Sequence, residues 1–155
     1  MKFICPLIVV EDIEKSRRFY ETVLNQTIQA DYGENVFFKG GFAIHQKKHF
    51  QSLINHADII SKSNHFELYF EHDRLEETVE KIKTLGLEFM HEIKEEPWKQ
   101  RVIRFYDYDK NLIEIGESME HTAFRLYNQN YSIEKICKIT YLSREEVERT
   151  VEKYS

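Results

Sequence analysis

The sequence predicts an α+β fold made of two βαβββ modules followed by a helical segment. The first observation behind this prediction is composition: the chain has 155 residues, 41% hydrophobic and 32% charged, which is typical of a globular chain with a core of its own. The second is that a strand, a helix and three strands occur twice in the same order. The third is a polar tail with two helix-start signals. We expect one domain over residues 1–118 and a helical extension over residues 119–155.

The first module begins with an apolar strand over residues 3–10. Asp12 is placed to cap a helix of about a dozen residues, and Asn25 is placed to end that helix in the left-handed conformation. Turn signals then separate three short strands, which are expected near residues 27–31, 35–39 and 42–47.

The second module follows a polar, His-containing connector over residues 48–63. A strand is expected over residues 65–71. Asp73 and Glu76 have the spacing of a capping box at the start of a helix over residues 73–85. Three further strands complete the module and are expected near residues 87–93, 101–107 and 111–117.

The duplication predicts two curved sheets with pseudo-twofold symmetry, which form a barrel around a shared cleft. Side chains alternate between the two faces of a strand, so the face opposite the helices is expected to line the cleft. Both modules place ionisable groups at corresponding positions of that face, which favours a binding site. The alternative is a polar face that only contacts water, as in many antiparallel sheets. The cleft-facing candidates are His45, His65, Glu67, Tyr69, Arg104, Tyr106 and Glu114.

The net charge and the cysteine content indicate which binding partners and which cellular location to expect. The net charge of -5 opposes contact with a nucleic-acid backbone and is compatible with a neutral or cationic small molecule. The two cysteines form no CxxC pair, so a reducing cytoplasm is the expected location.

No apolar run approaches the ~18 residues of a membrane span. The apolar start of the chain runs into Glu11 and Asp12 without a cleavage site, so we expect a strand there and no signal peptide.

Two segments carry a resemblance to a known family. "LIVVEDIEKSRRFYETVLN", residues 7–25, and "RFYDYDKNLIEIGE", residues 104–117, resemble the opening strand and helix and the closing hairpin of the vicinal oxygen chelate superfamily. This superfamily contains glyoxalases, bleomycin-resistance proteins and extradiol dioxygenases, and the resemblance covers residues 3–117. It implies a small-molecule ligand or substrate and a homodimer. Tyr108 and Lys110 stand where the family usually has Pro and Gly, and we expect this difference to affect the hairpin more than the chemistry.

The resemblance also implies a metal site in metal-dependent members. Its ligand positions fall on four residues of this chain, which are Cys5, His45, His65 and Glu114. Cys5 stands where His, Gln or Glu is more usual, and His45 where some members have Glu and others no ligand. Such a set suits zinc, nickel, manganese or iron. The alternatives are a buried apolar thiol at Cys5, a surface histidine at His45, and a Glu114 that pairs with Arg104 across the hairpin.

Two function classes follow. One is a divalent-metal-dependent enzyme of lyase, isomerase or dioxygenase type, in which Glu114 is a ligand or the base. The other is a metal-free protein that binds or sequesters a small molecule, as bleomycin-resistance proteins do. Its walls would be Tyr69, Trp98 and Tyr106, its charge partners Glu67 and Glu114, and its anion contacts Arg101 and Arg104. The alternative for Trp98 is a core residue at the end of the barrel.

The tail carries its own helix signals. Ser132 and Ser143 are placed as N-caps, and Ser143 and Glu146 have the spacing of a capping box. The stretch over residues 132–147 resembles a helix-turn-helix. Because the second helix has more Glu than Lys and Arg, phosphate contact is opposed, and we expect the tail to pack on the barrel or to pair subunits.

Overall fold

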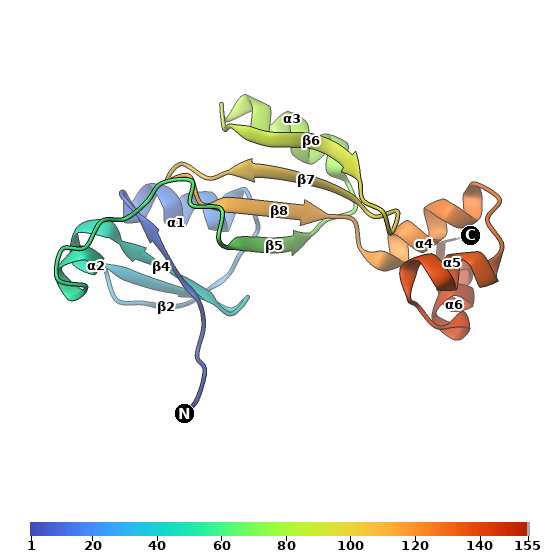
Figure 1. Ribbon diagram of the computed structural model, residues 1–155, viewed down its shortest axis with the longest axis horizontal. Coiled ribbons are helices and arrows are strands. Elements are labelled where there is room, and N and C mark those ends of the chain that lie inside the picture. The colour runs from blue at the N-terminus through green and yellow to red at the C-terminus, as the bar shows by residue number, and fades with distance from the viewer. Residues whose placement is uncertain (155) are drawn as a thin grey trace. The chain divides into compact units, whose positions relative to one another are not determined.

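The computed structural model describes residues 1–154 and confirms the α+β class, with six helices and two four-stranded sheets (Figure 1). The chain divides into two compact units. Unit 1 contains residues 1–66 and the turn at residues 106–111. Unit 2 contains residues 67–105 and the chain from residue 112 onward. Among the described helices, none combines the length and the apolarity that crossing a bilayer would take.

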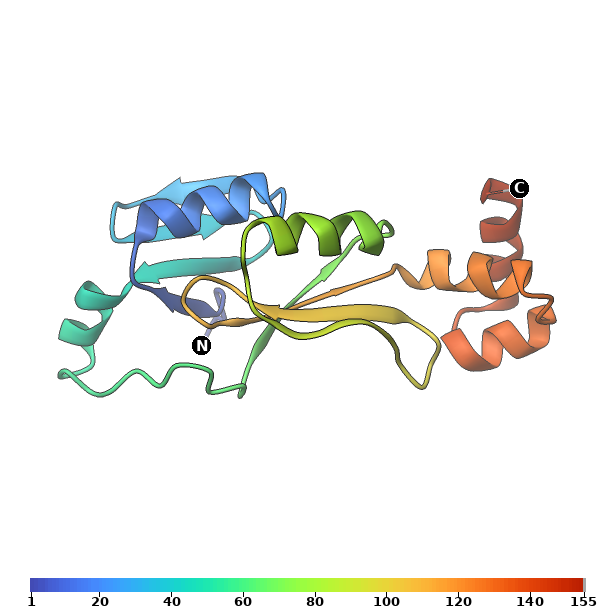
Figure 2. The same cartoon turned by 90° about the horizontal axis from the view of Figure 1, so that it is seen from above.

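Unit 1 is a sheet with the strand order β1-β4-β3-β2 and two helices. The strand β1 pairs parallel with β4, and β3 pairs antiparallel with both β4 and β2. Figure 2 shows α1 lying along this sheet. The elements are β1 (Leu7–Val10), α1 (Ile13–Thr22), β2 (Ile28–Asp31), β3 (Asn35–Phe38), β4 (Phe42–Gln46) and α2 (Lys47–Leu53).

Local sequence signals explain the ends of α1. The side chain of Asp12 accepts a hydrogen bond from the backbone N–H of Lys15 at 3.0 Å, which confirms the predicted N-cap. Asn25 has a φ of 54°, as the predicted helix stop requires. The apolar face of α1 packs on the sheet through Tyr20, whose ring centroid lies 5.3 Å from that of Phe42.

The turn at residues 106–111 completes unit 1. Tyr20 donates a hydrogen bond to Asp107 at 2.9 Å, and Ser16 donates to Asp109 at 3.1 Å. Lys110 adopts a φ of 67° without being glycine, while the ring of Tyr108 lies 5.5 Å from that of Phe19. The two departures from the family pattern are therefore accommodated by the turn and by packing on α1.

Unit 2 contains the sheet β5-β8-β7-β6, which has the same kind of order as the first sheet. The parallel pair places Tyr69 of β5 opposite Glu114 of β8. The apolar face of α3 is buried through Leu75, Val79 and Ile82. The elements are β5 (Glu67–Glu71), α3 (Leu75–Thr84), β6 (Phe89–Glu95), β7 (Arg101–Tyr106) and β8 (Leu112–Gly116).

Three helices follow β8: α4 (Met119–Asn128), α5 (Ile133–Thr140) and α6 (Arg144–Tyr154). They bury a small core of Ala123, Leu126, Ile136 and Val147. Ser132 caps α5 as predicted, and Ser143 and Glu146 exchange the two hydrogen bonds of a capping box. The division of the chain at residue 118 stays a prediction, as do the barrel and its shared cleft.

Several sequence-based boundaries were wrong. The first strand begins at Leu7 rather than at residue 3, and β5 begins at Glu67 rather than at residue 65. Helix α2 begins at Lys47, the expected end of the preceding strand, and runs into the stretch that was expected to be only a connector, and α4 was not expected. Short helices without a strong apolar period, such as α2, leave little signal in a sequence.

The predicted capping box at Asp73 is also wrong. The N-cap of α3 is Arg74, one residue later than predicted, and it makes no side-chain cap bond, while Asp73 accepts from the backbone N–H of Ser118 at 2.8 Å. A long-range contact has taken the carboxylate that the local pattern assigned to α3. Asp73 thereby holds the start of α4, where Ser118 is the N-cap.

Candidate functional site

Two of the four predicted metal ligands lie outside the strands on which they were expected. Cys5 is partly buried and lies ahead of β1, and His65 is exposed and lies ahead of β5. The alternation of side chains along a strand therefore does not orient either residue. Their role as ligands stays a prediction.

His45 lies on β4 and is only 6% exposed, so it is not a surface histidine. Its Nε2 lies 2.8 Å from Nδ1 of His49 on α2, and its Nδ1 lies 3.2 Å from the side-chain amide nitrogen of Asn35. The ring of Phe50 covers it at a centroid distance of 5.4 Å. Burial, and then the neighbouring His49, lowers the pKa of His45 below its ordinary value. Both ring nitrogens thus have partners.

Unit 2 carries a denser group, which we call the Arg104 cluster: Arg104, Glu67, Glu96, Glu114 and His91. The guanidinium donates from Nε to Glu67 at 3.0 Å and from Nη1 to Glu96 at 2.9 Å. Its Nη2 forms an ion pair with Oε2 of Glu114, and this oxygen has no separate hydrogen bond within the described chain. His91 lies opposite Arg104 in the β6–β7 ladder, with Nε2 3.4 Å from Nη1.

The electrostatics of the cluster follow from these contacts. Burial lowers the pKa of Arg104, but its bonds to Glu96 and Glu67 outweigh burial and raise the pKa above its ordinary value. The bond from Arg104 lowers the pKa of Glu96. Lys94 also pairs with Glu96, at 3.8 Å, so three carboxylates against one guanidinium and one ammonium leave a formal charge of -1 when all are ionised. The cluster therefore favours a neutral or cationic neighbour over an anion.

The side chains as they lie do not fit a metal ion at Glu114. This carboxylate is 6% exposed, and the permanent cation beside it is Arg104. In unit 1, His45 already has partners on both ring nitrogens. Within neither unit, over residues 1–154, do three His, Cys, Asp or Glu side chains gather in a way that could hold a metal ion. The predicted alternative for Glu114, a pair with Arg104, is what the structure has.

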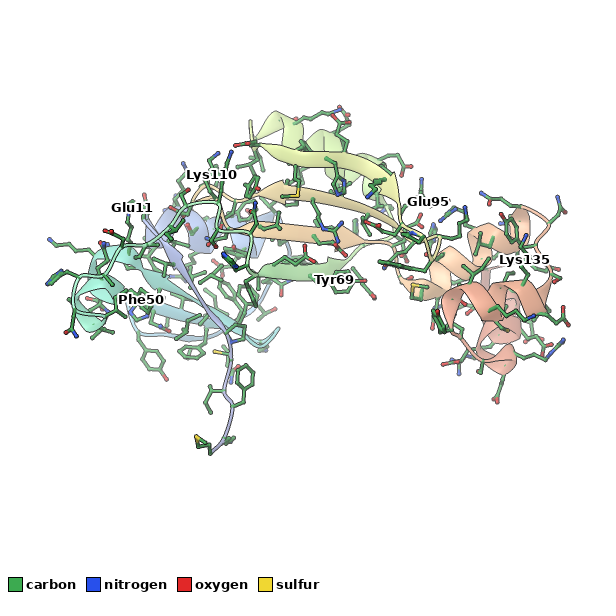
Figure 3. The ribbon with its side chains drawn as sticks, viewed as in Figure 1. Glu11, Phe50, Tyr69, Glu95, Lys110 and Lys135 are labelled. Atoms are coloured by element: carbon green, nitrogen blue, oxygen red, sulfur yellow. The ribbon has the colours of Figure 1, made fainter. Side chains whose placement is uncertain are left out.

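A second group, which we call the aromatic wall, joins Tyr69 of β5 to Trp98 and Gln100 of the loop between β6 and β7. Gln100 donates to the hydroxyl of Tyr69 at 2.9 Å and accepts from the indole N–H of Trp98 at 2.9 Å. Tyr69 and Trp98 are 48% and 41% exposed, so Trp98 is not a core residue. Figure 3 shows the side chain of Tyr69 extending from β5. Tyr69 also donates to Glu71 at 2.9 Å, and burial is the main cause that raises its pKa to about 12.

The remaining candidates lie elsewhere. Arg101 binds Glu117 and Glu76 and takes no part in the Arg104 cluster. Tyr106 belongs to unit 1, where its hydroxyl donates to Asn64 at 2.9 Å. Of the predicted ligand contacts, the structure thus brings together Glu67, Arg104 and Glu114, and separately Tyr69 and Trp98.

Sequence reasoning missed Glu96, His91 and Gln100. Glu96 and Gln100 are the first and last residues of the loop between β6 and β7, and no period of the sequence relates them to the residues that they contact. His91 reaches Arg104 through the β6–β7 register, which shifts on both sides of it. An alternating pattern does not reveal such a shift.

Comparisons with known proteins agree with the fold. The model of the glyoxalase-like domain family matches residues 3–120. The chain is 24% identical over 131 residues to the fosfomycin resistance protein FosX of Listeria monocytogenes, covering 79% of this chain and 93% of that protein.

Two solved structures are also similar. A protein of unknown function from Agrobacterium tumefaciens is 36% identical, with a TM-score of 0.66 over 76% of this chain and 94% of its own. FosX of Listeria monocytogenes, in complex with Mn(II) and sulfate, is 22% identical, with a TM-score of 0.59 over 81% of this chain and 97% of its own. With most of its length matched by the family model, the chain belongs to the glyoxalase-like domain family of the vicinal oxygen chelate superfamily.

Proposed function

We propose that the chain is a glyoxalase-like protein that binds a small molecule at the sheet of unit 2. The Arg104 cluster supplies the charged part of this site, and the aromatic wall supplies its flat apolar part. Tyr69 connects the two groups, because it lies opposite Glu114 in the β5–β8 ladder. Half-exposed aromatic rings beside a fixed set of polar groups are typical of ligand sites.

The observation that carries the proposal is the pairing of Glu114 with Arg104. It supplies the cation that a buried carboxylate needs, so binding at this site is proposed to be independent of a metal. The formal charge of -1 on the cluster and Lys94 supports a neutral or cationic ligand with an aromatic or otherwise flat part. Tyr106, Arg101, Cys5, His45 and His65 are not required by this proposal.

A second candidate is a metal-dependent enzyme. The observation that favours it is the likeness to FosX, which was crystallised with Mn(II). This function requires Glu114 to leave Arg104, and His65 with His45 or Cys5 to complete the metal site. Zinc, nickel, manganese and iron all remain candidates for it.

Calorimetric titration separates the two candidates. We expect wild type to bind Mn(II), Zn(II), Ni(II) and Fe(II) no more tightly than Glu114→Gln and His65→Ala do. Binding by wild type that is weakened at least about tenfold in both variants would instead establish the metal site. Fosfomycin, a phosphonate and hence an anion, is the matching ligand probe, and the charge of the cluster predicts no binding.

The ligand site itself is tested with a panel of aromatic amines and their neutral analogues. Binding is followed by the fluorescence of Trp98, the only tryptophan of the chain. We expect Tyr69→Ala and Glu67→Gln to weaken the binding of any compound that the panel identifies. Tyr127→Ala is the matched control, because Tyr127 is as exposed as Trp98 but lies on α4. Equal binding by Tyr69→Ala and the control would contradict the site.

Two further properties belong to the proposal. Residues 1–118 form the ligand-binding domain and residues 119–155 an appended segment that packs on it. The family resemblance and this segment support a homodimer, for which sedimentation of the full chain is the test.

A further inference from the structure

We propose that the helices after β8 position the aromatic wall, and that Arg125 and Glu117 are the positioning residues. The inference rests on the proposed function only for the role of the wall in ligand binding. The positioning itself follows from contacts within unit 2 and is measured without a ligand.

The loop between β6 and β7 carries two of the three residues of the wall. It is closed by hydrogen bonds from the N–H of Glu96 to the carbonyl of Gln100, and from the N–H of Lys99 to the carbonyl of Glu96, both 2.8 Å. Lys99 adopts a φ of 70°, a conformation that a side chain other than glycine rarely takes. Contacts from outside the loop therefore have to hold it in this form.

Gln100 supplies the first contact. Its Nε2 donates to the carbonyl of Glu117 at 2.7 Å as well as to Tyr69, while its Oε1 accepts from Trp98. An indole N–H is only a donor and a carbonyl is only an acceptor, so the orientation of this amide is fixed. Gly116 permits the approach, because a Cβ there would lie 2.8 Å from Nε2 of Gln100. The wall is thus tied to the backbone at the end of β8.

Arg125 supplies the second contact. It lies on α4, and its Nη2 donates to the carbonyl of Lys99 at 2.5 Å and to Glu117 at 3.0 Å. One guanidinium therefore joins the loop that carries Trp98 to the carboxylate that precedes α4. Nε of Arg125 also donates to Glu117, at 3.3 Å, so two nitrogens of the guanidinium hold this carboxylate in a charge-assisted, directional contact.

Glu117 makes the contact rigid. It is fully buried, and its Oε1 accepts from Nε of Arg101 at 2.5 Å. Thr122 and Arg125 lie on its other oxygen. A buried carboxylate between two arginines holds both in one geometry, since neither can leave without uncovering a charge. Helix α4 is further fixed at its start by the bond from Ser118 to Asp73.

The consequence is that the helical segment is coupled to the ligand site. With the loop held from α4, Tyr69 and Trp98 are fixed before a ligand arrives, and the cost of ordering them is removed from binding. The feature that makes this testable is the single tryptophan, which lies in the loop that Arg125 holds.

The test measures acrylamide quenching of Trp98 fluorescence in the full-length chain. We expect Arg125→Met to raise the quenching constant about twofold, because a loop that has lost its anchor exposes the indole more often. Arg125→Lys keeps the charge without the fork and is expected to give an intermediate value. Arg144→Met is the matched control, since Arg144 is an exposed arginine of α6 that pairs with Glu134 and Glu148.

If Arg125→Met unfolds the helices, Arg125→Lys decides the test, and a quenching constant equal to that of wild type overturns the role of Arg125. Gln100→Met tests the other anchor of the wall. It leaves Arg125 and Glu117 in place and removes the link between Trp98 and Tyr69, so the same rise in quenching is expected with unchanged helical circular dichroism. Quenching that stays at the wild-type value in folded Arg125→Met, or that rises equally in Arg144→Met, overturns the positioning role. If no compound of the panel binds, the proposed function is contradicted. The quenching results still decide the positioning role, because they are measured without a ligand.

Discussion

At the scale of the residue, Glu114 poses the main chemical problem of the chain. A buried carboxylate is costly unless a cation or hydrogen bonds compensate it. Arg104 provides this compensation and also binds Glu67 and Glu96, so one guanidinium forms ion pairs with three carboxylates. Removing the arginine leaves a cluster of like charges, whereas removing one acid leaves a cluster closer to neutral.

This asymmetry predicts the effect of Arg104→Met. We expect the free energy of unfolding to fall by about 3–5 kcal/mol, since a buried charge loses its partner. Glu67→Gln, at the exposed side of the cluster, is expected to cost less than about 1 kcal/mol. Urea denaturation measures both. Adding Glu114→Gln to Arg104→Met should restore part of the loss, and a double variant that is no more stable than Arg104→Met alone would argue against the pairing.

His45 predicts a dependence on pH. Burial lowers its pKa in the folded state below the ordinary value of 6.5, so folding favours the neutral ring. The stability from this group is present above about pH 6.5 and is lost as the pH falls through the folded pKa. We expect the Tm of wild type to drop between pH 7 and pH 5 by more than the Tm of His45→Gln. Parallel curves for the two proteins would show that His45 is not the group responsible.

At the scale of the element, the predictions succeeded where a local signal decides the structure. Asp12, Ser132 and the Ser143–Glu146 box cap their helices, because the bonds that define a cap lie within four residues. Asp73 did not, because α3 starts one residue later, with Arg74 as its N-cap, and the carboxylate of Asp73 accepts from Ser118, far along the chain. The alternation of side chains along β5 and β8 identified Glu67 and Glu114, because both residues lie within strands. It did not identify Glu96, because this residue reaches Arg104 from a loop.

Strand β8 offers a test of the close approach at its end. Gly116→Ala places a Cβ 2.8 Å from the amide nitrogen of Gln100, and the flexible end of that side chain has to move. We expect a loss of about 1–3 kcal/mol in stability, as for other overpacked sites, together with stronger quenching of Trp98. Gly33→Ala is a useful comparison, because nothing lies within 4 Å of a Cβ there and only its φ of 80° opposes the change. Gly33→Ala should therefore leave Trp98 unaffected.

At the scale of the whole molecule, the open question is whether the family domain folds without the helices that follow it. The helices have a core of their own around Leu126, which favours independence. Glu117 opposes it, because Arg125 and Thr122 of α4 supply part of its compensation and Arg101 supplies another part.

Truncation after residue 118 resolves this balance. Arg101 remains beside Glu117, so we expect a cooperative unfolding transition at lower urea, with a loss of roughly 1–3 kcal/mol for the charged hydrogen bonds of Arg125. In the truncated chain Glu117→Gln should recover part of this loss, because a neutral amide does not need the second arginine. In the full chain the same substitution should destabilise, since both arginines then face an amide. A truncated chain without any cooperative transition, with or without Glu117→Gln, would show that the domain does not end near residue 118.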